Sequence, residues 1–221
     1  FCDARTVATD AGYVVAAARR GRAAVTGGGL ADHAERAELE VGGQALPWLV
    51  YPGLFAGGMM DIMTKALLEA LPPPPPRGLI LDFCCGSGSI AAALGRRGGR
   101  DAPRLHLLDA DAVALEAAKE NVPSAKRFWL SDAWSAMPAD ISFDWILSNP
   151  PVHFGLKSDF SVLSALLSEG PRRLRPGGAL LLVAQTYVPV GLLAPEGSPA
   201  PAETLWTNGR FTVWRLPPAA A

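Results

Sequence analysis

The sequence predicts an α/β protein in which a mostly parallel, seven-stranded sheet is flanked by helices. Two observations favour this class. Apolar segments typical of buried strands each end in glycine or polar residues suited to ligand binding, and ligands of open parallel sheets bind outside the carboxyl ends of the strands. The chain is also long enough to bury a sizeable core, with 221 residues of which 49% are hydrophobic. The segments are residues 78–83, 105–108, 126–130 and 143–147.

Residues 1–50 are expected to form an N-terminal extension, and residues 51–221 the main domain. The extension is rich in alanine, arginine and glycine, and short strands are expected at residues 13–16 and 23–25. A hairpin is expected over residues 38–46, because the pair Gly42-Gly43 suits a two-residue turn between two strands.

The main domain is expected to open with a helix from residue 58 to residue 71, where apolar residues recur at helical spacing. The proline run 72–76 stops this helix. A helix follows the glycine turn, and another passes through residues 160–167 until Gly170-Pro171 ends it, because proline cannot donate inside a helix. The remaining strands are expected at residues 179–185, 202–206 and 211–216, with one late antiparallel strand and a hairpin turn at Asn208-Gly209.

The turn Asn149-Pro150-Pro151 stands close after the strand of residues 143–147. Each proline fixes φ and removes a backbone donor, and Pro150 pushes Asn149 towards an extended conformation. The turn is therefore stiff and offers acceptors. The Asn149 amide oxygen and the Pro150 carbonyl can both accept hydrogens of one amino group, which leaves the nitrogen lone pair free to attack an electrophile. Taken alone, a rigid surface turn explains the motif equally well.

Three earlier strands end in residues typical of a nucleoside site. The first leads into a turn with Gly86 and Gly88, where the backbone can approach a ligand at the positive end of the next helix. The second ends in Asp109, which is placed to hold two ribose hydroxyls. The third ends near Asp132, where a side chain can reach an adenine amino group. A dinucleotide-binding fingerprint has a third glycine where this chain has Ala91, so the glycine pattern alone is weak.

Together these motifs resemble the class I S-adenosylmethionine-dependent methyltransferases that act on planar amino nitrogens. Further segments are similar to the RsmC-type ribosomal RNA guanine-N2 methyltransferases, and the likeness covers most of residues 41–216. It implies a Rossmann-like fold, S-adenosyl-L-methionine as cofactor, and methylation of an exocyclic amine of RNA, with guanine N2 of small-subunit ribosomal RNA as the expected target. In that family a degenerate copy of the domain precedes the catalytic one, and residues 1–30 are a candidate remnant of it. The resemblance rests on Asp82-x-x-Cys85-Gly86-Ser87-Gly88, Asp109, Asp132, Asn149-Pro150-Pro151, Pro52-Gly53-Leu54-Phe55, residues 148–155 and residues 208–215.

The resemblance also implies roles for single residues. Val152 departs from the family pattern, in which an aromatic residue follows the two prolines and stacks on the target base. Either Phe154 takes over the stacking or the stacking is weaker, and Val152→Phe is then expected to leave activity equal or higher. The implied catalytic residues are Asn149, Pro150 and Pro151, and the implied substrate contacts are Phe55, His153 and Phe154. The implied cofactor-binding residues are Asp82, Cys84, Gly86, Gly88, Asp109, Ala110, Asp132, Ala133 and Asn149.

Charge and composition limit the partners that are expected for this chain. The formal net charge of −1 provides no overall attraction to nucleic acid, but arginines cluster at residues 19–22, 96–100 and 172–175, either as solvated helix ends or as a basic rim for RNA. The expected partner is ribosomal RNA or a partly assembled small ribosomal subunit. No membrane span is expected, because the apolar stretch 179–190 is shorter than a bilayer requires. No metal is expected either, since the three cysteines lack zinc spacing; they favour a reducing, cytoplasmic location, and no signal peptide is visible.

Three other functions fit part of the pattern. A protein glutamine N-methyltransferase would hold the planar glutamine amide in the same turn. A non-catalytic RNA-binding assembly factor that kept the fold is favoured by Val152, whereas the retained Asp82, Asp109 and Asn149 favour an intact cofactor site. A nicotinamide oxidoreductase is disfavoured by Ala91 and by the Asn-Pro-Pro turn.

Overall fold

The computed structural model describes residues 2–10, 13–19, 28–74, 76–97, 102–154, 157–193 and 202–219. The chain divides into two compact units, residues 1–34 and 35–221. In the first unit, strands β1 (Cys2–Asp10) and β2 (Tyr13–Arg19) form an antiparallel hairpin, and a 3-10 turn, η1, spans Leu30–His33. The strand expected at residues 13–16 lies within β2, and the one expected at residues 23–25 falls outside the described residues.

The larger unit begins with the hairpin β3 (Glu35–Val41) and β4 (Gln44–Val50). Gly42 and Gly43 both have positive φ, which confirms the two-glycine turn. The hairpin belongs to this unit because side chains from both strands, such as Leu39 and Trp48, are buried in one of its cores. The origin of residues 1–50 as an extension left from a duplicated domain stays a prediction.

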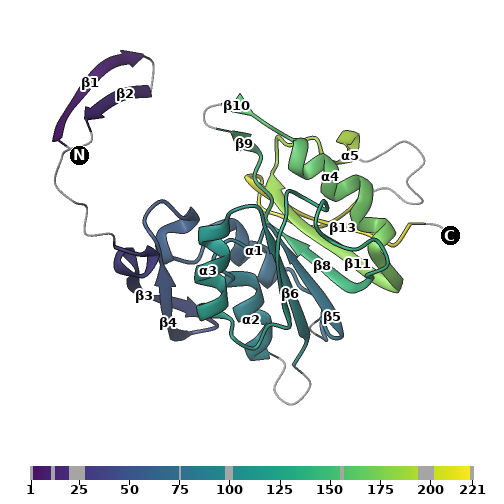
Figure 1. The fold of residues 1–221 in the computed structure, drawn as a ribbon. Helices are drawn as coiled ribbons and strands as arrows, with labels where there is room; N and C mark the ends of the chain where they lie inside the picture. The colour runs from purple at the N-terminus through teal and green to yellow at the C-terminus, as the bar shows by residue number, and fades with distance from the viewer. Residues whose placement is uncertain are drawn as a thin grey trace. The chain divides into compact units, whose positions relative to one another are not determined.

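In the described part of the chain, seven strands form one sheet in the order β12-β13-β11-β8-β5-β6-β7 (Figure 1). Parallel pairing joins β11, β8, β5, β6 and β7, and β13 runs antiparallel to both of its neighbours. The predicted sheet with one late antiparallel strand is thereby confirmed. The strands are β5 (Leu79–Phe83), β6 (Arg104–Asp109), β7 (Arg127–Leu130), β8 (Phe143–Ser148), β11 (Leu174–Gln185), β12 (Glu203–Thr207) and β13 (Phe211–Leu216).

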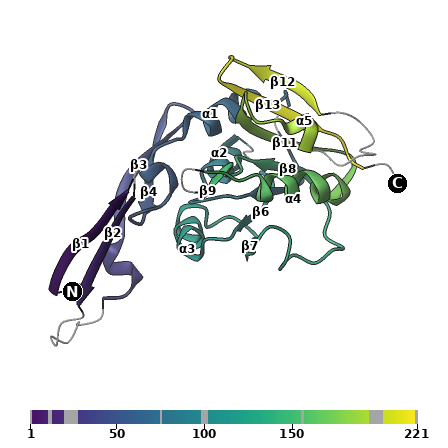
Figure 2. The same ribbon diagram turned by 90° about the horizontal axis from the view of Figure 1, so that it is seen from above.

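The sheet is buried on both faces, as its near-continuous apolar strands require. Successive residues point to opposite faces of a strand, so Leu181 enters one core and Leu180 the other. The first core lies under helices α1, α2 and α3 and the β3–β4 hairpin, and the second lies under α4 (Figures 1 and 2). The helices are α1 (Ile62–Glu69), α2 (Ser89–Arg97), α3 (Ala112–Asn121), α4 (Ser161–Glu169) and the short α5 (Val190–Leu193).

Some elements differ from their expected bounds. Helix α1 begins at Ile62 rather than within the glycine segment, because residues 55–58 form a separate 3-10 turn, η2. Helix α3 was not expected, although the capping residue Asp111 precedes it and buried alanines line it. Gly170-Pro171 does end α4, and the chain continues as a 3-10 turn, η4 (Gly170–Arg173). A small hairpin, β9 (His153–Phe154) with β10 (Lys157–Ser158), follows the Asn-Pro-Pro turn.

Candidate active site

The amide of Asn149 is held in one orientation by two residues of another segment. Its Nδ2 donates to Asp61 Oδ2 at 2.8 Å and to Thr64 Oγ1 at 3.0 Å. An ionised carboxylate only accepts hydrogen bonds, so the amide nitrogen has to face Asp61. The Asn149 oxygen therefore faces away, and no hydrogen bond from the described residues reaches it. The oxygen is thus available as an acceptor, and its role in holding an amino group stays a prediction.

Sequence reasoning did not find Asp61 and Thr64. Asp61 is the N-cap of α1, where its Oδ2 also accepts from the backbone N–H groups of Met63 and Thr64, each at 2.9 Å. An aspartate directly before an apolar helix is a recognisable capping signal. The contact with Asn149, 88 positions along the chain, has no such local signal.

The loop between β5 and α2 combines close packing with open space. Gly88 has φ +94°, and a Cβ there would lie 2.8 Å from Val122 Cγ2, so any side chain would press on α3. Gly86 has φ +53°, and a Cβ there would meet nothing within 4 Å. Both positions lie in the left-handed region that glycine tolerates best. The open side at Gly86 is where a ligand can approach the backbone.

This loop is anchored from outside by β4 and α3. Trp48 Nε1 donates to Ser87 Oγ at 3.2 Å, and Asn121 Nδ2 donates to the Ser87 carbonyl at 3.1 Å. Asn121 also exchanges two hydrogen bonds with the backbone of Leu49, at 2.7 and 2.9 Å. The hairpin before the main sheet thus helps to fix the shape of the glycine loop.

Asp109 joins the end of β6 to the same loop. Its Oδ2 accepts from the Gly86 N–H at 2.8 Å and its Oδ1 from the Asp111 N–H at 2.9 Å. Burial raises the pKa of Asp109, and the backbone N–H groups of Asp111 and Gly86 oppose that rise. Each carboxylate oxygen can accept a further hydrogen, so Asp109 can still hold hydroxyls of a ligand.

Asp82 lies fully buried beneath the loop. Its Oδ2 accepts from the Ala91 N–H at 3.1 Å, and its buried Oδ1 has no partner among the described residues. Burial raises the pKa of Asp82 to about 8; the Ala91 hydrogen bond lowers it and the negative Asp109 raises it further. Burial also raises the pKa of the Cys84 and Cys85 thiols well above the usual range, so neither thiol is an activated nucleophile.

We expect Asp82→Asn to flatten the dependence of stability on pH. In the native state the Asp82 carboxyl group keeps a proton that it releases near pH 4 in the unfolded chain. Asp82 therefore lowers the free energy of unfolding as pH rises from about 4 to about 8. Urea unfolding of both proteins at pH 5, 6, 7 and 8 measures the effect: the parent should lose several kcal/mol more than the variant. Parallel curves would contradict the raised pKa.

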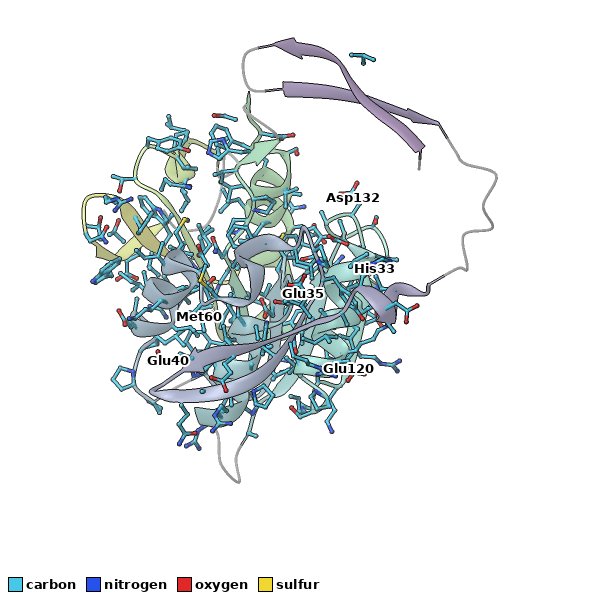
Figure 3. All side chains as sticks on the ribbon, turned by 90° about the vertical axis from the view of Figure 1, so that its left-hand side faces the viewer. His33, Glu35, Glu40, Met60, Glu120 and Asp132 are labelled. Carbon is cyan, nitrogen blue, oxygen red and sulfur yellow. The ribbon has the colours of Figure 1, made fainter. Side chains whose placement is uncertain are left out.

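The other predicted cofactor residues follow neighbouring parallel strands. Ala110 comes after β6, and Asp132 and Ala133 come after β7, so they lie at the same edge of the sheet as the glycine loop. Ala110 and Asp132 are exposed, and Ala133 is half-buried with φ +44°. Figure 3 shows Asp132 on the loop that follows β7. The structure brings these residues to one edge, and their roles stay predictions.

The predicted substrate residues differ in their surroundings. Phe55 is 69% exposed on η2, and the exposed His153 shares a 2.7 Å hydrogen bond between its Nε2 and the hydroxyl of Tyr187. The side chain of Phe154 lies outside the described residues. Pro150 is buried and Pro151 exposed. Tyr187, which sequence reasoning missed, lies in the turn after β11 and ties that turn to His153 in the segment after Asn149.

Val152 is buried at 5% exposure and packs in the core under α4, with Phe83 and Leu163 among its cluster. The expectation that Val152→Phe leaves activity unchanged or raised stays a prediction, and the burial of Val152 adds an expectation about stability. We expect this substitution to lower the free energy of unfolding by about 1–3 kcal/mol, because extra volume in a packed core forces neighbours to move. Urea unfolding of Val152→Phe beside Val152→Ile tests this; equal stability of the phenylalanine variant and the parent would show unfilled space beside the turn.

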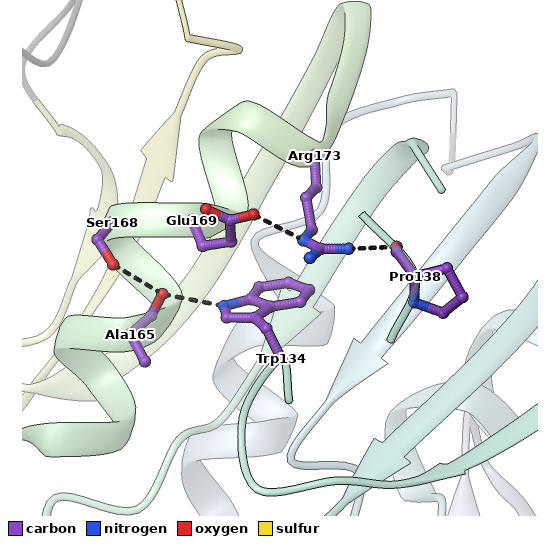
Figure 4. A network of polar contacts seen from close by, with 6 residues as sticks. All are labelled: Trp134, Pro138, Ala165, Ser168, Glu169 and Arg173. Atoms are coloured by element: carbon purple, nitrogen blue, oxygen red, sulfur yellow. Dashed lines mark hydrogen bonds and ion pairs between the residues drawn. The ribbon is translucent and has the colours of Figure 1, made fainter. Parts of the chain in front are cut away.

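The arginines at residues 172–175 do not form a uniform basic rim. Arg173 is buried: its Nε contacts Glu169 at 3.1 Å, its Nη1 donates to the Pro138 carbonyl at 2.7 Å, and its guanidinium lies 4.9 Å from the Trp134 ring centroid (Figure 4). Arg175 pairs with Asp144 at 2.8 Å. Both side chains hold elements together, so they are not free for phosphates.

The described residues include neither a membrane-spanning helix nor a metal-binding cluster. None of the described helices combines the length and apolar character needed to cross a membrane. The same residues contain no group of three or more histidine, cysteine, aspartate or glutamate side chains placed to hold a metal ion.

Known proteins are similar to this chain in sequence. Residues 46–214 match the family model described as "Methyltransferase small domain". A ribosomal RNA small subunit methyltransferase C of Photorhabdus laumondii is 32% identical over 167 residues, which is 74% of this chain and 48% of that protein. The protein of the same name in Chromohalobacter salexigens is 37% identical over 145 residues, covering 63% and 42%. The chain thus spans about half the length of the curated relatives it matches.

A solved structure extends the likeness to the fold. It is that of the T. thermophilus 16S rRNA N2-guanine methyltransferase RsmC in complex with AdoMet and guanosine. The match has a TM-score of 0.78 at 25% identity and covers 97% of this chain and 58% of the other. The predicted architecture is confirmed by this likeness.

Proposed function

Because the chain belongs to the methyltransferase small domain family, whose class I fold it has, we propose that it methylates guanine N2 in small-subunit ribosomal RNA, using S-adenosylmethionine. The observation that carries the proposal is the orientation of Asn149. Its amide nitrogen is occupied by Asp61 and Thr64, and its oxygen is free to accept from an amine. The named relatives are about twice as long, so their activity is proposed for this chain and not transferred to it outright.

The residues around the glycine loop fit the cofactor. The loop leaves open space at Gly86, the buried Oδ1 of Asp82 lacks a partner, and the Asp109 carboxylate retains acceptor capacity. A cationic ligand above Asp82 would favour ionisation of that carboxyl group, and Asp109 is suited to a pair of ribose hydroxyls. When bound, S-adenosylmethionine supplies a methyl group activated by a positively charged sulfur.

Asn149 and Pro150 prepare the amine. The Asn149 oxygen and the Pro150 carbonyl each accept one of its hydrogens, so the nitrogen lone pair points away from both. The amine gains the methyl carbon, the electron pair of the broken carbon–sulfur bond stays on sulfur, and one amine proton leaves to water. Because proton loss can follow the transfer, alignment contributes more than a strong base. His153, held by Tyr187, is proposed as a substrate contact rather than a base.

The target base must be accessible at the carboxyl edge of the sheet. A guanine inside a helix would have to be unstacked first, so we propose free or partly assembled small-subunit RNA in the cytoplasm as the substrate. The exposed ring of Phe55, six residues before Asp61 in the chain, offers an apolar surface for a base. Phe154 is proposed as a second stacking residue on sequence grounds alone.

Labelled methyl transfer tests the function. The chain is incubated with methyl-labelled S-adenosylmethionine and with naked or partly assembled small-subunit RNA, and the RNA is digested to nucleosides. We expect label in N2-methylguanosine. Label in glutamine-containing peptides but not in RNA would favour a protein methyltransferase. RNA binding with no transfer to either substrate would favour the assembly factor.

A further inference from the structure

A second group of side chains lies at the edge of the sheet that carries Asn149. Strand β11 pairs in parallel with β8, with Leu182 opposite Ser148, so both strands end at this edge. Strand β13 is antiparallel and begins there, with Phe211 opposite Gln185. The pairing continues beyond the strands, because the Thr186 N–H donates to the Arg210 carbonyl at 2.9 Å.

The two strand ends line a cavity of about 530 Å³. The Tyr187 ring at its edge is 60% exposed, and the guanidinium carbon of Arg210 lies 5.3 Å from the Phe211 ring centroid. An exposed ring and a cation suit an aromatic, anionic ligand. The lining residues are Gln185, Thr186, Tyr187, Gly209, Arg210 and Phe211.

Two polar groups in this cavity lack partners within the described chain. The Oε1 atom of Gln185 is buried and accepts no hydrogen bond there. The Arg210 side chain, directly before β13, makes no ion pair among the described residues, whereas Arg215, within β13, pairs with Glu203 at 3.5 Å. A buried acceptor left unpaired is costly. Because the Gln185 Oε1 atom is buried, a ligand in the cavity does not reach it, whereas the exposed Arg210 guanidinium can bind an anion.

The cavity is connected to the reaction site by side-chain contact. Tyr187 binds His153, which stands four residues after Asn149. Neighbouring strands lie about 5 Å apart, so β11 and β13 are roughly 5 and 10 Å from β8. A stacked nucleic acid strand advances by about 3.4 Å per nucleotide, so these distances correspond to about one to three nucleotides.

We propose that this cavity is a subsite for a nucleotide flanking the target guanine. The Arg210 guanidinium holds a phosphate, and the Tyr187 ring stacks on the flanking base. This inference rests on the proposed function, since the flanking nucleotide is defined by the target. By contrast, the exposed glutamates of β3 at positions 35, 38 and 40 would repel a phosphate chain; Figure 3 labels the first and last of them.

The salt dependence of RNA binding tests the subsite. A short single-stranded RNA containing the target guanine is titrated with the full chain saturated with S-adenosylhomocysteine, at a series of salt concentrations. We expect Arg210→Gln to weaken RNA affinity about tenfold at low salt and to reduce the log–log salt slope by about 0.7, the effect of one lost phosphate contact on a single strand. Arg215→Gln, at a residue within β13 that is paired with Glu203, is the matched control and should match the parent.

Two variants of Tyr187 test whether its ring stacks on a base. Tyr187→Phe keeps the stacking surface and removes the hydrogen bond to His153, whereas Tyr187→Ala removes both. If the ring stacks on a base, the alanine variant should lose roughly tenfold in RNA affinity beyond the phenylalanine variant, with an unchanged salt slope. Affinity for S-adenosylhomocysteine, measured by calorimetry, should not change in any of these variants.

Separate outcomes distinguish the subsite from the function. If the parent chain methylates RNA and Arg210→Gln keeps the parent's RNA affinity and salt slope, the subsite is overturned and the proposed function is not. A parent chain that neither binds nor methylates RNA would overturn both. If a glutamine-containing peptide competes for the cavity and Arg210→Gln leaves RNA affinity unchanged, the cavity is assigned to a protein substrate. That result would refute the nucleotide subsite.

Discussion

Asn149→Ala is expected to lower the rate of methyl transfer by about 100-fold or more, while affinity for S-adenosylmethionine stays within a few-fold of the parent. The variant removes the oriented acceptor for the amine, and a small loss of alignment at a reacting atom can cost this much in rate. It leaves Gly86 and Asp109, the proposed cofactor contacts, untouched. Single-turnover transfer to RNA measures the rate, and calorimetry with S-adenosylmethionine measures the binding.

Variants of the two supporting residues show whether orientation is what matters. Thr64→Val removes one of the two hydrogen bonds to the Asn149 amide, and Asp61→Asn lets that amide turn over, because an asparagine can both donate and accept. Each should lower the rate by less than Asn149→Ala does. Asp61→Asn keeps an N-cap oxygen for α1, so its melting temperature serves as the control. Transfer by Asn149→Ala at the parent rate would refute the role of the turn as an amine clamp.

Asp109→Ala is expected to weaken S-adenosylmethionine binding by about 1.5–3 kcal/mol, the range for hydrogen bonds lost to a charged group. The carboxylate has two functions that disappear together: it is the proposed acceptor for ribose hydroxyls, and it holds the Gly86 N–H at 2.8 Å. The loss should appear as a higher dissociation constant in calorimetry. The maximal rate at saturating cofactor should fall much less than for Asn149→Ala.

The neighbouring Asp111 provides the matched control. Its Oδ1 accepts from Val113 and Ala114 at the start of α3, at 2.8 and 3.3 Å, so Asp111→Ala removes a helix cap. That variant should lose about 1 kcal/mol of stability and no cofactor affinity. Equal cofactor affinity of Asp109→Ala and the parent would remove Asp109 from the site, and tighter competitive binding of NADH would contradict the methyltransferase proposal.

The sequence by itself determined where the main strands lie along the chain and which residues stand at their carboxyl ends. Apolar strands between turn residues are local patterns, and the glycine loop, Asp109 and the Asn-Pro-Pro turn each follow such a strand directly. Once the strands pair in parallel, their ends meet at one edge without any further information. Helix α3 was missed because its apolar face consists largely of alanines, which give a weak periodic signal.

Only the tertiary structure decided which side chains meet across these elements. The Asp61–Asn149 contact, the anchoring of Ser87 by Trp48 and Asn121, and the cavity at Arg210 each join segments far apart in the chain. Val152 shows the same limit, because its place in the core depends on how α4 packs on the sheet and not on the motif that precedes it. Local patterns specify strands and turns. The packing of helices on a sheet sets the distances between side chains. Those distances determine which acceptor is free, which carboxyl is buried and which cation lacks a partner.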